Sequence, residues 1–326
     1  MKKMNIVKII GIAVAALVVI LFLCIAYIYF FLPNIPVQDL KVEVTPGRVE
    51  RGKYLANHVT ACMDCHSTRD WSRFSGPPLP GTEGKGGEKF DQTMGFPGTF
   101  YSPNITPYTL EGWSDGEIYR AITSGVGKGD RPFFPVMPYP YYGQLDTEDI
   151  YSIIAYLRSL PSIEYKAPVS EPDFPMNIIL HMIPGKAAPS VKPEKSDTLA
   201  YGQYLVKAAG CIECHTKDKK GQIIQELAFS GGREFKMPDG LLVSPNITPD
   251  KETGIGTWTR DGFILRFKAY DLTTYVPPAI NKGDMMTLMP WTMYAGMDTT
   301  DLSSVYKALM ALKPISNKVV RWMTYK

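Results

Sequence analysis

The stretch Cys62-Met63-Asp64-Cys65-His66 decides how this chain is interpreted, because the sequence repeats its pattern as Cys211-Ile212-Glu213-Cys214-His215. Upstream, Gly52-Lys53-Tyr54-Leu55 recurs 150 positions later as Gly202-Gln203-Tyr204-Leu205. Downstream, the hexapeptide Ser-Pro-Asn-Ile-Thr-Pro occurs unchanged at residues 102–107 and 244–249, and a tryptophan follows each copy. Self-similarity of this kind is typical of a duplicated structural unit. We therefore expect two related halves.

The two copies stay in register to the end of each half. Met137-Pro138-Tyr139 matches Met289-Pro290-Trp291, and residues 146–157 match residues 298–309 at a constant offset of 152. Apolar residues in these last segments follow the spacing of an amphipathic helix, and the leading aspartates Asp146 and Asp298 suit its N-cap. A second helix is predicted before each cysteine motif. Residues 67–101 are rich in Gly and Pro and are predicted to be loop, which suggests that something other than side chains fills part of the core.

The two C-x-x-C-H motifs hold four of the five cysteines, and their pattern is that of covalent c-type haem attachment. Two thiols on one helical turn can form thioethers with the haem vinyl groups, and His66 or His215 then reaches the iron. Disulfides, a thioredoxin-like redox pair and zinc sites are alternatives, but none requires a histidine directly after the second cysteine. A zinc cluster would also need further ligands, and only His58 and His181 remain. We expect two haem c groups, attached through Cys62, Cys65, Cys211 and Cys214.

The repeat also selects the second iron ligand from 15 methionines. Met137 lies 71 residues after His66, and Met289 lies 74 residues after His215. Each is followed by proline and an aromatic residue, just ahead of the terminal helix of its half. Other methionines of the second half have no counterpart in the first, which favours core packing for them. We therefore predict Met137 and Met289 as axial ligands.

Four further residues recur near the predicted haem sites. Trp113 and Trp258 follow the two hexapeptides, where each indole N–H could bond a haem propionate or each ring could simply fill the core. Asn104 and Asn246 lie inside the hexapeptides, whose prolines fix φ and whose polar side chains can bond locally. These loops are expected to set a rigid backbone path past the cofactor.

Two histidines lack a repeated counterpart. His58 aligns near an alanine and is predicted to lie on a helix surface. His181 belongs to the apolar run 177–183 of the Pro-rich stretch between the halves, and that run is expected to dock on a domain or a partner. Capping a haem is the alternative role for His181.

Residues 9–32 form an uncharged run of 24 residues, which is long enough to cross the ~30 Å hydrocarbon core of a bilayer. No small-residue cleavage site follows it, so an uncleaved anchor is expected. Lys2, Lys3 and Lys8 precede the run and the first acid is Asp39, which predicts a cytoplasmic N-terminus and export of all that follows. Cys24 is interpreted as an apolar residue of the span rather than as a lipidation site.

Composition excludes several classes of function. The 326 residues are 45% hydrophobic and 21% charged, which is ordinary for folded protein and rules out wholesale disorder. From residue 33 onward 32 basic residues face 32 acidic ones, so no basic surface for nucleic acid is expected.

The combined motifs resemble class I cytochrome c domains, and in particular the membrane-bound cytochrome c subunits of bacterial alcohol and aldehyde dehydrogenases. Those subunits usually carry three haems, whereas this chain has two motifs. The resemblance implies an all-α fold in which each domain wraps one haem, with His66 and Met137 on the first iron and His215 and Met289 on the second. The expected plan is a cytoplasmic N-terminus (1–8), a transmembrane anchor (9–32), a stalk (33–49), a cytochrome c domain (50–161), a Pro-rich linker (162–198) and a second cytochrome c domain (199–326).

A haem with histidine and methionine on its two faces leaves no open position for substrate and is suited to passing single electrons. We therefore expect an electron carrier at the inner membrane, with periplasmic haem domains and no catalytic residues. Its donor would be a quinol-oxidising complex or a periplasmic dehydrogenase, and its acceptor a soluble cytochrome or a terminal oxidase. One alternative is a haem enzyme such as a di-haem peroxidase with one open iron, since residues 271–283 are inserted before Met289. Another is a subunit that anchors a dehydrogenase.

Overall fold

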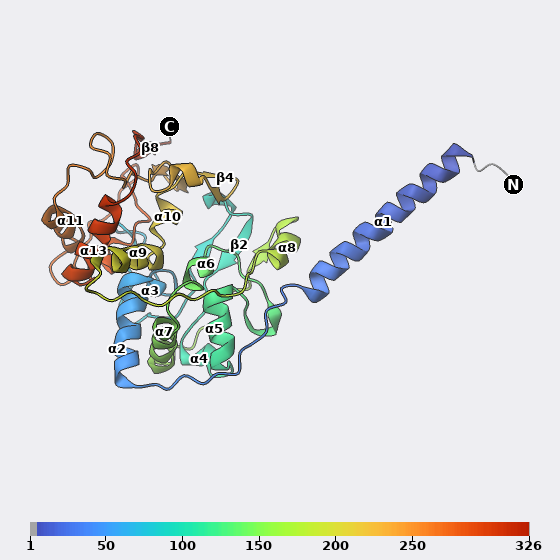
Figure 1. The fold of residues 1–326 in the computed structure, drawn as a ribbon, viewed down its shortest axis with the longest axis horizontal. Coiled ribbons are helices and arrows are strands. Elements are labelled where there is room, and N and C mark those ends of the chain that lie inside the picture. Colours follow the sequence, from blue (N-terminus) through green and yellow to red (C-terminus); the bar gives the residue numbers. More distant parts are fainter. Residues whose placement is uncertain (1–4, 326) are drawn as a thin grey trace.

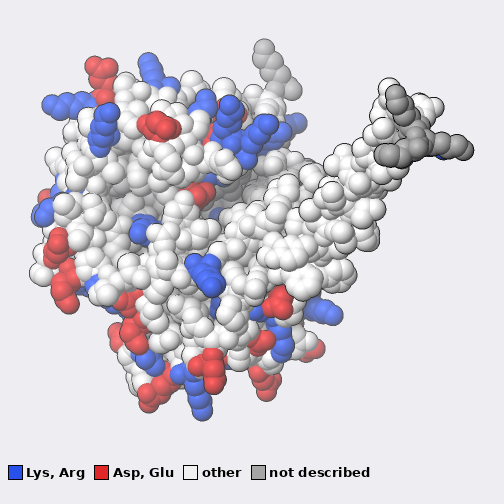
Figure 2. All heavy atoms as spheres, turned by 45° about the vertical axis from the view of Figure 1, so that its right-hand side comes forward, with Lys and Arg blue, Asp and Glu red and all other residues white. Residues whose placement is uncertain are grey.

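The computed structural model describes residues 5–325, so Lys2 and Lys3, which carry part of the predicted orientation signal, lie outside the described residues. Helix α1 (Ile6–Phe31) projects away from the remainder of the chain (Figure 1). It is long and apolar enough to cross a membrane, and the protein buries none of its residues. From Ile9 to Phe31 the helix carries no charged side chain, and Figure 2 shows this length of the rod as white, whereas both signs of charge are scattered over the body of the molecule. Cys24 is exposed on this rod.

Each half is built around one pair of long helices that pack at very close range. The pairs are α2 (Pro46–Tyr54) with α7 (Thr147–Ser159), and α9 (Thr198–Ala208) with α13 (Thr299–Met310). A Cβ atom at Gly52 would lie 1.8 Å from the carbonyl oxygen of Ser152, and one at Gly202 would lie 1.9 Å from that of Ser304. The repeated glycine is therefore required because the helix backbones touch there. The predicted terminal helices are confirmed.

The shorter helices complete the two halves and the stretch between them. In the first half they are η1 (Leu55–Val59, a π-helical turn), α3 (Cys62–Cys65), η2 (Gln92–Met94), α4 (Pro107–Leu110), α5 (Asp115–Ser124), η3 (Lys128–Asp130) and α6 (Tyr139–Tyr142). The connector, residues 162–198, holds α8 (Met176–Ile179) and η4 (Leu180–Met182). The second half adds α10 (Cys211–Cys214), η5 (Gln225–Leu227), α11 (Arg260–Lys268) and α12 (Trp291–Tyr294).

The expectation of an all-α fold is correct for the dominant elements but misses eight short strands within residues 5–325. About 41% of the residues are helical and 10% lie in strands. Strands of two to four residues are too short to show a hydrophobic period, so they could not be predicted from the sequence pattern. Among residues 5–325 these strands pair antiparallel in three sheets. The first sheet holds β1 (Lys89–Phe90), β2 (Gly98–Tyr101) and β3 (Glu171–Pro172), the second holds β4 (Asp218–Lys219) and β5 (Gln222–Ile223), and the third holds β6 (Glu234–Met237), β7 (Gly240–Val243) and β8 (Trp322–Thr324).

The two halves are joined through a continuous apolar core and a reciprocal pair of hydrogen bonds. Leu55 and Ile154 of the first half belong to the same buried cluster as residues of α9 and α13. The Tyr54 hydroxyl donates to Asp301 at 2.8 Å, and the Tyr204 hydroxyl donates to Asp149 at 2.8 Å. Each bond runs from the first helix of one half to the last helix of the other.

Two lysines of the connector pair with the aspartates that accept these bonds. Lys192 Nζ lies 2.8 Å from Asp149, and Lys195 Nζ lies 3.1 Å from Asp301. Burial alone would raise the pKa of Asp149, but its bonds to Arg51 and Lys192 hold that pKa below its usual value. Both carboxylates are therefore satisfied while shielded from water.

Replacing Tyr204 with phenylalanine removes the hydroxyl that donates to the buried Asp149 carboxylate and that accepts from the Asp146 amide at 3.2 Å. A hydrogen bond to a charged group is worth about 1.5–3 kcal/mol, and we expect the free energy of unfolding to fall by that amount. Tyr306→Phe is the matched control, because its hydroxyl donates to the Trp258 carbonyl at an exposed position and surface changes cost within about 0.5 kcal/mol. Denaturant unfolding of the two variants measures the difference, and equal losses would contradict the assigned role.

Candidate functional site

The two C-x-x-C-H motifs adopt the same local structure. Each pair of cysteines spans a single helical turn, α3 or α10, which is entered through a left-handed residue, Ala61 (φ 49°) or Gly210 (φ 61°). The following histidines also match, with φ and ψ of −94° and 28° at His66 and −96° and 25° at His215. All five cysteines carry free thiols. Within residues 5–325 no three His, Cys, Asp or Glu side chains gather as a metal cluster.

Both motif histidines are held in the form that binds a metal. His66 Nδ1 lies 2.8 Å from the carbonyl oxygen of Pro103, and His215 Nδ1 lies 2.9 Å from that of Pro245. A carbonyl only accepts, so Nδ1 carries the proton and the lone pair stays on Nε2. Burial lowers the pKa of both histidines and keeps the rings neutral, although the carbonyl bonds oppose this. A buried carbonyl partner of this kind fixes the orientation of a metal-binding imidazole.

The repeated hexapeptide supplies these carbonyls, and its asparagine holds it in place. Asn104 Oδ1 accepts hydrogen bonds from the amide and the hydroxyl of Thr106 at 2.8 and 2.7 Å, and Asn246 accepts the same pair from Thr248 at 2.9 and 2.7 Å. The Asn104 amide group donates to the carbonyls of Ile163 and Tyr165, beyond the terminal helix. Asn104 and Asn246 therefore brace the loop that orients the histidine, which is the rigid backbone path predicted for it.

A tyrosine in each half ties the predicted methionine segment to the histidine side of the site. Tyr142 donates to the carbonyl of Thr60 at 2.8 Å, and Tyr294 donates to that of Ala209 at 2.9 Å. Each tyrosine follows the predicted methionine by five residues, and each carbonyl precedes the first motif cysteine by two. The pair of bonds sets the spacing between the two segments that would carry the iron ligands.

Met137 and Met289 lie in turns of the same geometry. The Tyr139 amide donates to the Met137 carbonyl and the Trp291 amide to the Met289 carbonyl, both at 2.8 Å. Both methionines are half-buried against the common core. The segment inserted before Met289 does not alter this turn.

The backbone of Met289 is held by a residue of the opposite half, a contact that the sequence did not indicate. The Ser75 hydroxyl donates to the Met289 carbonyl at 2.6 Å. Ser75 is buried and has φ of 68°, a conformation that costs a non-glycine residue energy and marks a constrained position. The loop that carries it also pairs with the insertion, through the Phe74 amide and the Pro278 carbonyl at 2.9 Å and through a bridge between Arg73 and Ala279.

The acidic residue between the two cysteines of each motif was not among the predicted site residues. Asp64 is buried and pairs with Arg69 at 3.1 Å, and Glu213 pairs with Arg233 at 3.1 Å. Burial raises the pKa of Asp64 to about 6, against the effect of Arg69. Glu213 also accepts a hydrogen bond from Tyr141, which lies four residues beyond Met137 in the other half. The recurrence of an acid directly before the second cysteine was the available signal.

The remaining candidate residues are the two repeated tryptophans and the two histidines outside the motifs. Trp113 is half-buried on the core and Trp258 is exposed, and among residues 5–325 neither indole N–H has a protein acceptor.

His58 is not on a free helix surface as expected, because its ring is half-buried between the halves with Nδ1 2.9 Å from the Met293 carbonyl. His181 docks with the connector on the end of α1, where Nδ1 donates to the Leu32 carbonyl at 2.8 Å.

The described residues fit a covalently attached haem. Each half offers two free thiols on one turn, a neutral histidine whose Nε2 is unprotonated, and a methionine segment tied to that turn by a tyrosine.

Comparison with known proteins agrees with this chemistry. No family model matches the chain. It is 28% identical over 241 residues to the cytochrome c subunit of the quinone-dependent alcohol dehydrogenase of Gluconobacter oxydans (strain 621H), which covers 68% of this chain and 46% of the relative. It is 30% identical over 252 residues to the gluconate 2-dehydrogenase cytochrome c subunit of Pantoea cypripedii, covering 71% and 53%. A diheme cytochrome c-type protein of Cereibacter sphaeroides is 28% identical over 215 residues, covering 63% and 69%.

The chain spans about half the length of the first two relatives. It is nevertheless similar to cytochrome c subunits of dehydrogenases over most of its own length, and this similarity supports haem c as its cofactor.

Proposed function

We propose that this protein is a membrane-anchored cytochrome with two haem c groups that passes single electrons and catalyses no reaction of its own. The observation that carries the proposal is the pair of C-x-x-C-H turns, each with its histidine locked by a proline carbonyl so that Nε2 is unprotonated. Bound haem supplies one-electron redox chemistry, and axial methionine shifts its potential upward. The cytochrome c names of the relatives support this assignment.

Within each half, two cysteines would attach the haem and a histidine and a methionine would bind its iron. Cys62 and Cys65 would form the thioethers, and His66 and Met137 would occupy the two axial positions of the first iron. The corresponding residues of the second site are Cys211, Cys214, His215 and Met289. Two domains of the class I cytochrome c type, residues 50–161 and 199–326, are the arrangement that this ligand set implies.

The location proposed is the inner membrane, with α1 as the anchor and both haem domains on the periplasmic side. Lys8 at the start of α1, with Lys2 and Lys3 before it, supports a cytoplasmic N-terminus by the positive-inside rule. The electron donor would be a dehydrogenase, as the names of the relatives suggest, or a quinol-oxidising complex. The acceptor would be a soluble cytochrome or a terminal oxidase, bound through a small and transient interface.

The visible spectrum of the purified full-length protein, oxidised and reduced, tests the proposal together with haem quantification. We expect two haems per chain, wholly low-spin, with the long-wavelength band of methionine-bound ferric iron. Added CO should then bind negligibly. A high-spin fraction near half of the haem, with rapid CO binding, would contradict a closed carrier and would favour a haem enzyme with one open iron.

Removing the Ser75 hydroxyl should weaken the second site although Ser75 belongs to the first half. The lost bond to the Met289 carbonyl is worth about 1 kcal/mol, so imidazole should displace Met289 about five-fold more readily in Ser75→Ala. Ser75→Gly, which also relieves the strained φ, should behave alike. Ser72→Ala on the exposed part of the same loop is the control, and imidazole titration of the long-wavelength band is the measurement. A change confined to the first site would refute the assigned role.

A further inference from the structure

The connector carries an apolar segment that the proposed electron transfer does not use. Residues 174–183 contain no charged side chain. Phe174 is 80% exposed, Met182 is 51% exposed and Ile183 is 37% exposed. Three large apolar side chains of one short segment thus face outward from the protein.

This connector segment is seated beside the end of α1. Helix α8 and turn η4 both contact α1. The ring of His181 lies 4.7 Å from that of Tyr29, and its Nδ1 donates to the Leu32 carbonyl, the first one past the helix. The half-buried residues of α1 are confined to its last two turns, at Ile25, Ala26 and Ile28. The contact is therefore made at one end of the candidate span only.

The position of that contact along α1 sets its depth relative to a bilayer. The 26 residues of α1 are about 39 Å long, against ~30 Å for the hydrocarbon core. Its last turns therefore reach the boundary between acyl chains and headgroups on the side of the haem-bearing halves. A segment packed on those turns lies at the same level.

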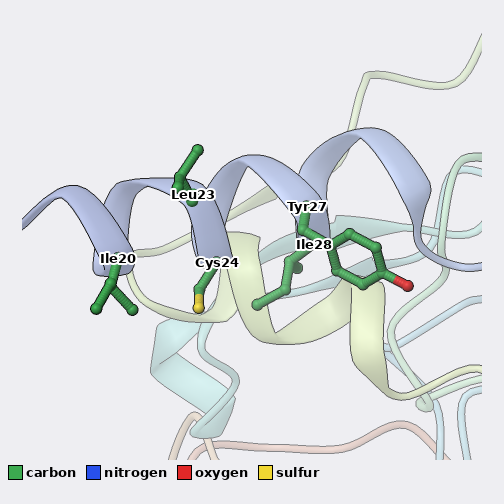
Figure 3. Close-up of a pocket in the computed structure, with 5 residues that line it drawn as sticks. All are labelled: Ile20, Leu23, Cys24, Tyr27 and Ile28. Carbon is green, nitrogen blue, oxygen red and sulfur yellow. The ribbon is translucent and has the colours of Figure 1, made fainter.

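The surface of α1 near this contact is apolar. A shallow hollow of about 410 Å³ on α1 is lined by Ile20, Leu23, Cys24, Tyr27 and Ile28. In Figure 3 the side chains of Cys24 and Ile28 point to the side of α1 on which α8 passes. No charged group lines this hollow, so acyl chains are the material that suits it.

Both ends of the connector segment are fixed to the first half. Before it, β3 pairs with β2, and the Asp173 amide donates to the Pro97 carbonyl at 3.0 Å. After it, the Ala188 amide donates to the Gly143 carbonyl at 2.8 Å. Because both ends of the segment are fixed to the first half, any surface that binds the segment also orients that half.

We propose that residues 174–183 form a second membrane contact, lying in the interface beside α1 with Phe174, Met182 and Ile183 in lipid. Short apolar surfaces flanked by charge, here Asp173 and Lys186, bind at this boundary without crossing it. The occupant of the exposed face is the lipid bilayer. The inference rests on the proposed anchoring by α1. Its consequence is that the haem-bearing halves are held at one orientation to the membrane instead of swinging on a single helix.

Spin labels on the full-length holoprotein in phosphatidylcholine–phosphatidylglycerol nanodiscs test this directly. In a Cys24→Ser background, a nitroxide is placed by Phe174→Cys or Met182→Cys, and collision with oxygen is compared with collision with a water-soluble nickel chelate. Leu17→Cys on α1 reports lipid, and Val276→Cys, at a residue 78% exposed on the second half, reports water. All four positions are exposed, and an unchanged haem spectrum verifies folding.

We expect the labels at 174 and 182 to collide with the nickel chelate several-fold less than the label at 276, and to approach the oxygen accessibility at 17. Nickel accessibility at 174 and 182 equal to that at 276, with position 17 still in lipid, would overturn the second contact and leave the anchor standing. Nickel accessibility at position 17 as well would overturn the anchor and this inference together.

Discussion

Replacing Met137 with alanine is expected to open one iron to added ligands and to lower one of two reduction potentials, leaving the other nearly unchanged. Methionine ligation raises the potential of a c-type haem, and axial ligands span a range of ~0.8 V, so the shift should be a sizeable part of that range. The first site should respond alone because its ligand segment is held by Tyr142 within the same half. A potentiometric titration followed by absorbance measures both potentials.

The controls for this prediction come from the same chain. Met289→Ala should produce the mirror result at the other potential. Met285→Ala, at an exposed residue four positions earlier, should leave both potentials in place. CO should bind about half of the haem in either ligand variant. An unaltered pair of potentials in Met137→Ala would show that Met137 is not an iron ligand.

Adding one methyl group at Gly52 is expected to cost about 3 kcal/mol of folding free energy or more. The new Cβ would lie 1.8 Å from the Ser152 carbonyl oxygen and 2.5 Å from its carbon, and neither backbone atom can rotate away. Helices α2 and α7 would have to separate, which places the cost at the upper end of overpacking, ~1–3 kcal/mol and occasionally more. Thermal unfolding and haem content of Gly52→Ala measure the effect.

The matched control lies in the same helix. A Cβ at Gly47 would meet nothing within 4 Å, and Gly47 does not have a positive φ. Gly47→Ala should therefore be neutral or stabilise the protein by about 0.4–1 kcal/mol through the unfolded chain. Similar unfolding midpoints for the two variants would mean that the helices can part at low cost.

The repeat in the sequence predicted the parts of the site that depend on local order. Residues 146–157 and 298–309 show enough apolar period to predict helices, and the C-x-x-C-H pattern fixes which side chains share one turn. The role of Asn104 was foreseen as loop bracing, because a short amide next to proline bonds locally. These are all features of contiguous residues.

What the sequence could not reveal depends on partners far along the chain. Ser75 meets Met289 across 214 positions, and Tyr54 meets Asp301 across 247. No local pattern encodes such pairs, and position 75 shows no unusual residue type. His58 was misplaced for the same reason, since a helix surface becomes an interface only when the other half covers it.

The reciprocal tyrosine–aspartate bonds have the form of an isologous interface. Tyr54 meets Asp301, while Tyr204, its equivalent, meets Asp149, the equivalent of Asp301. In two-fold dimers each subunit offers the same patch to the other. Here both patches belong to one polypeptide, so their association is intramolecular, with an effective concentration of roughly millimolar or above. The pairing of the two halves is therefore independent of how dilute the protein is.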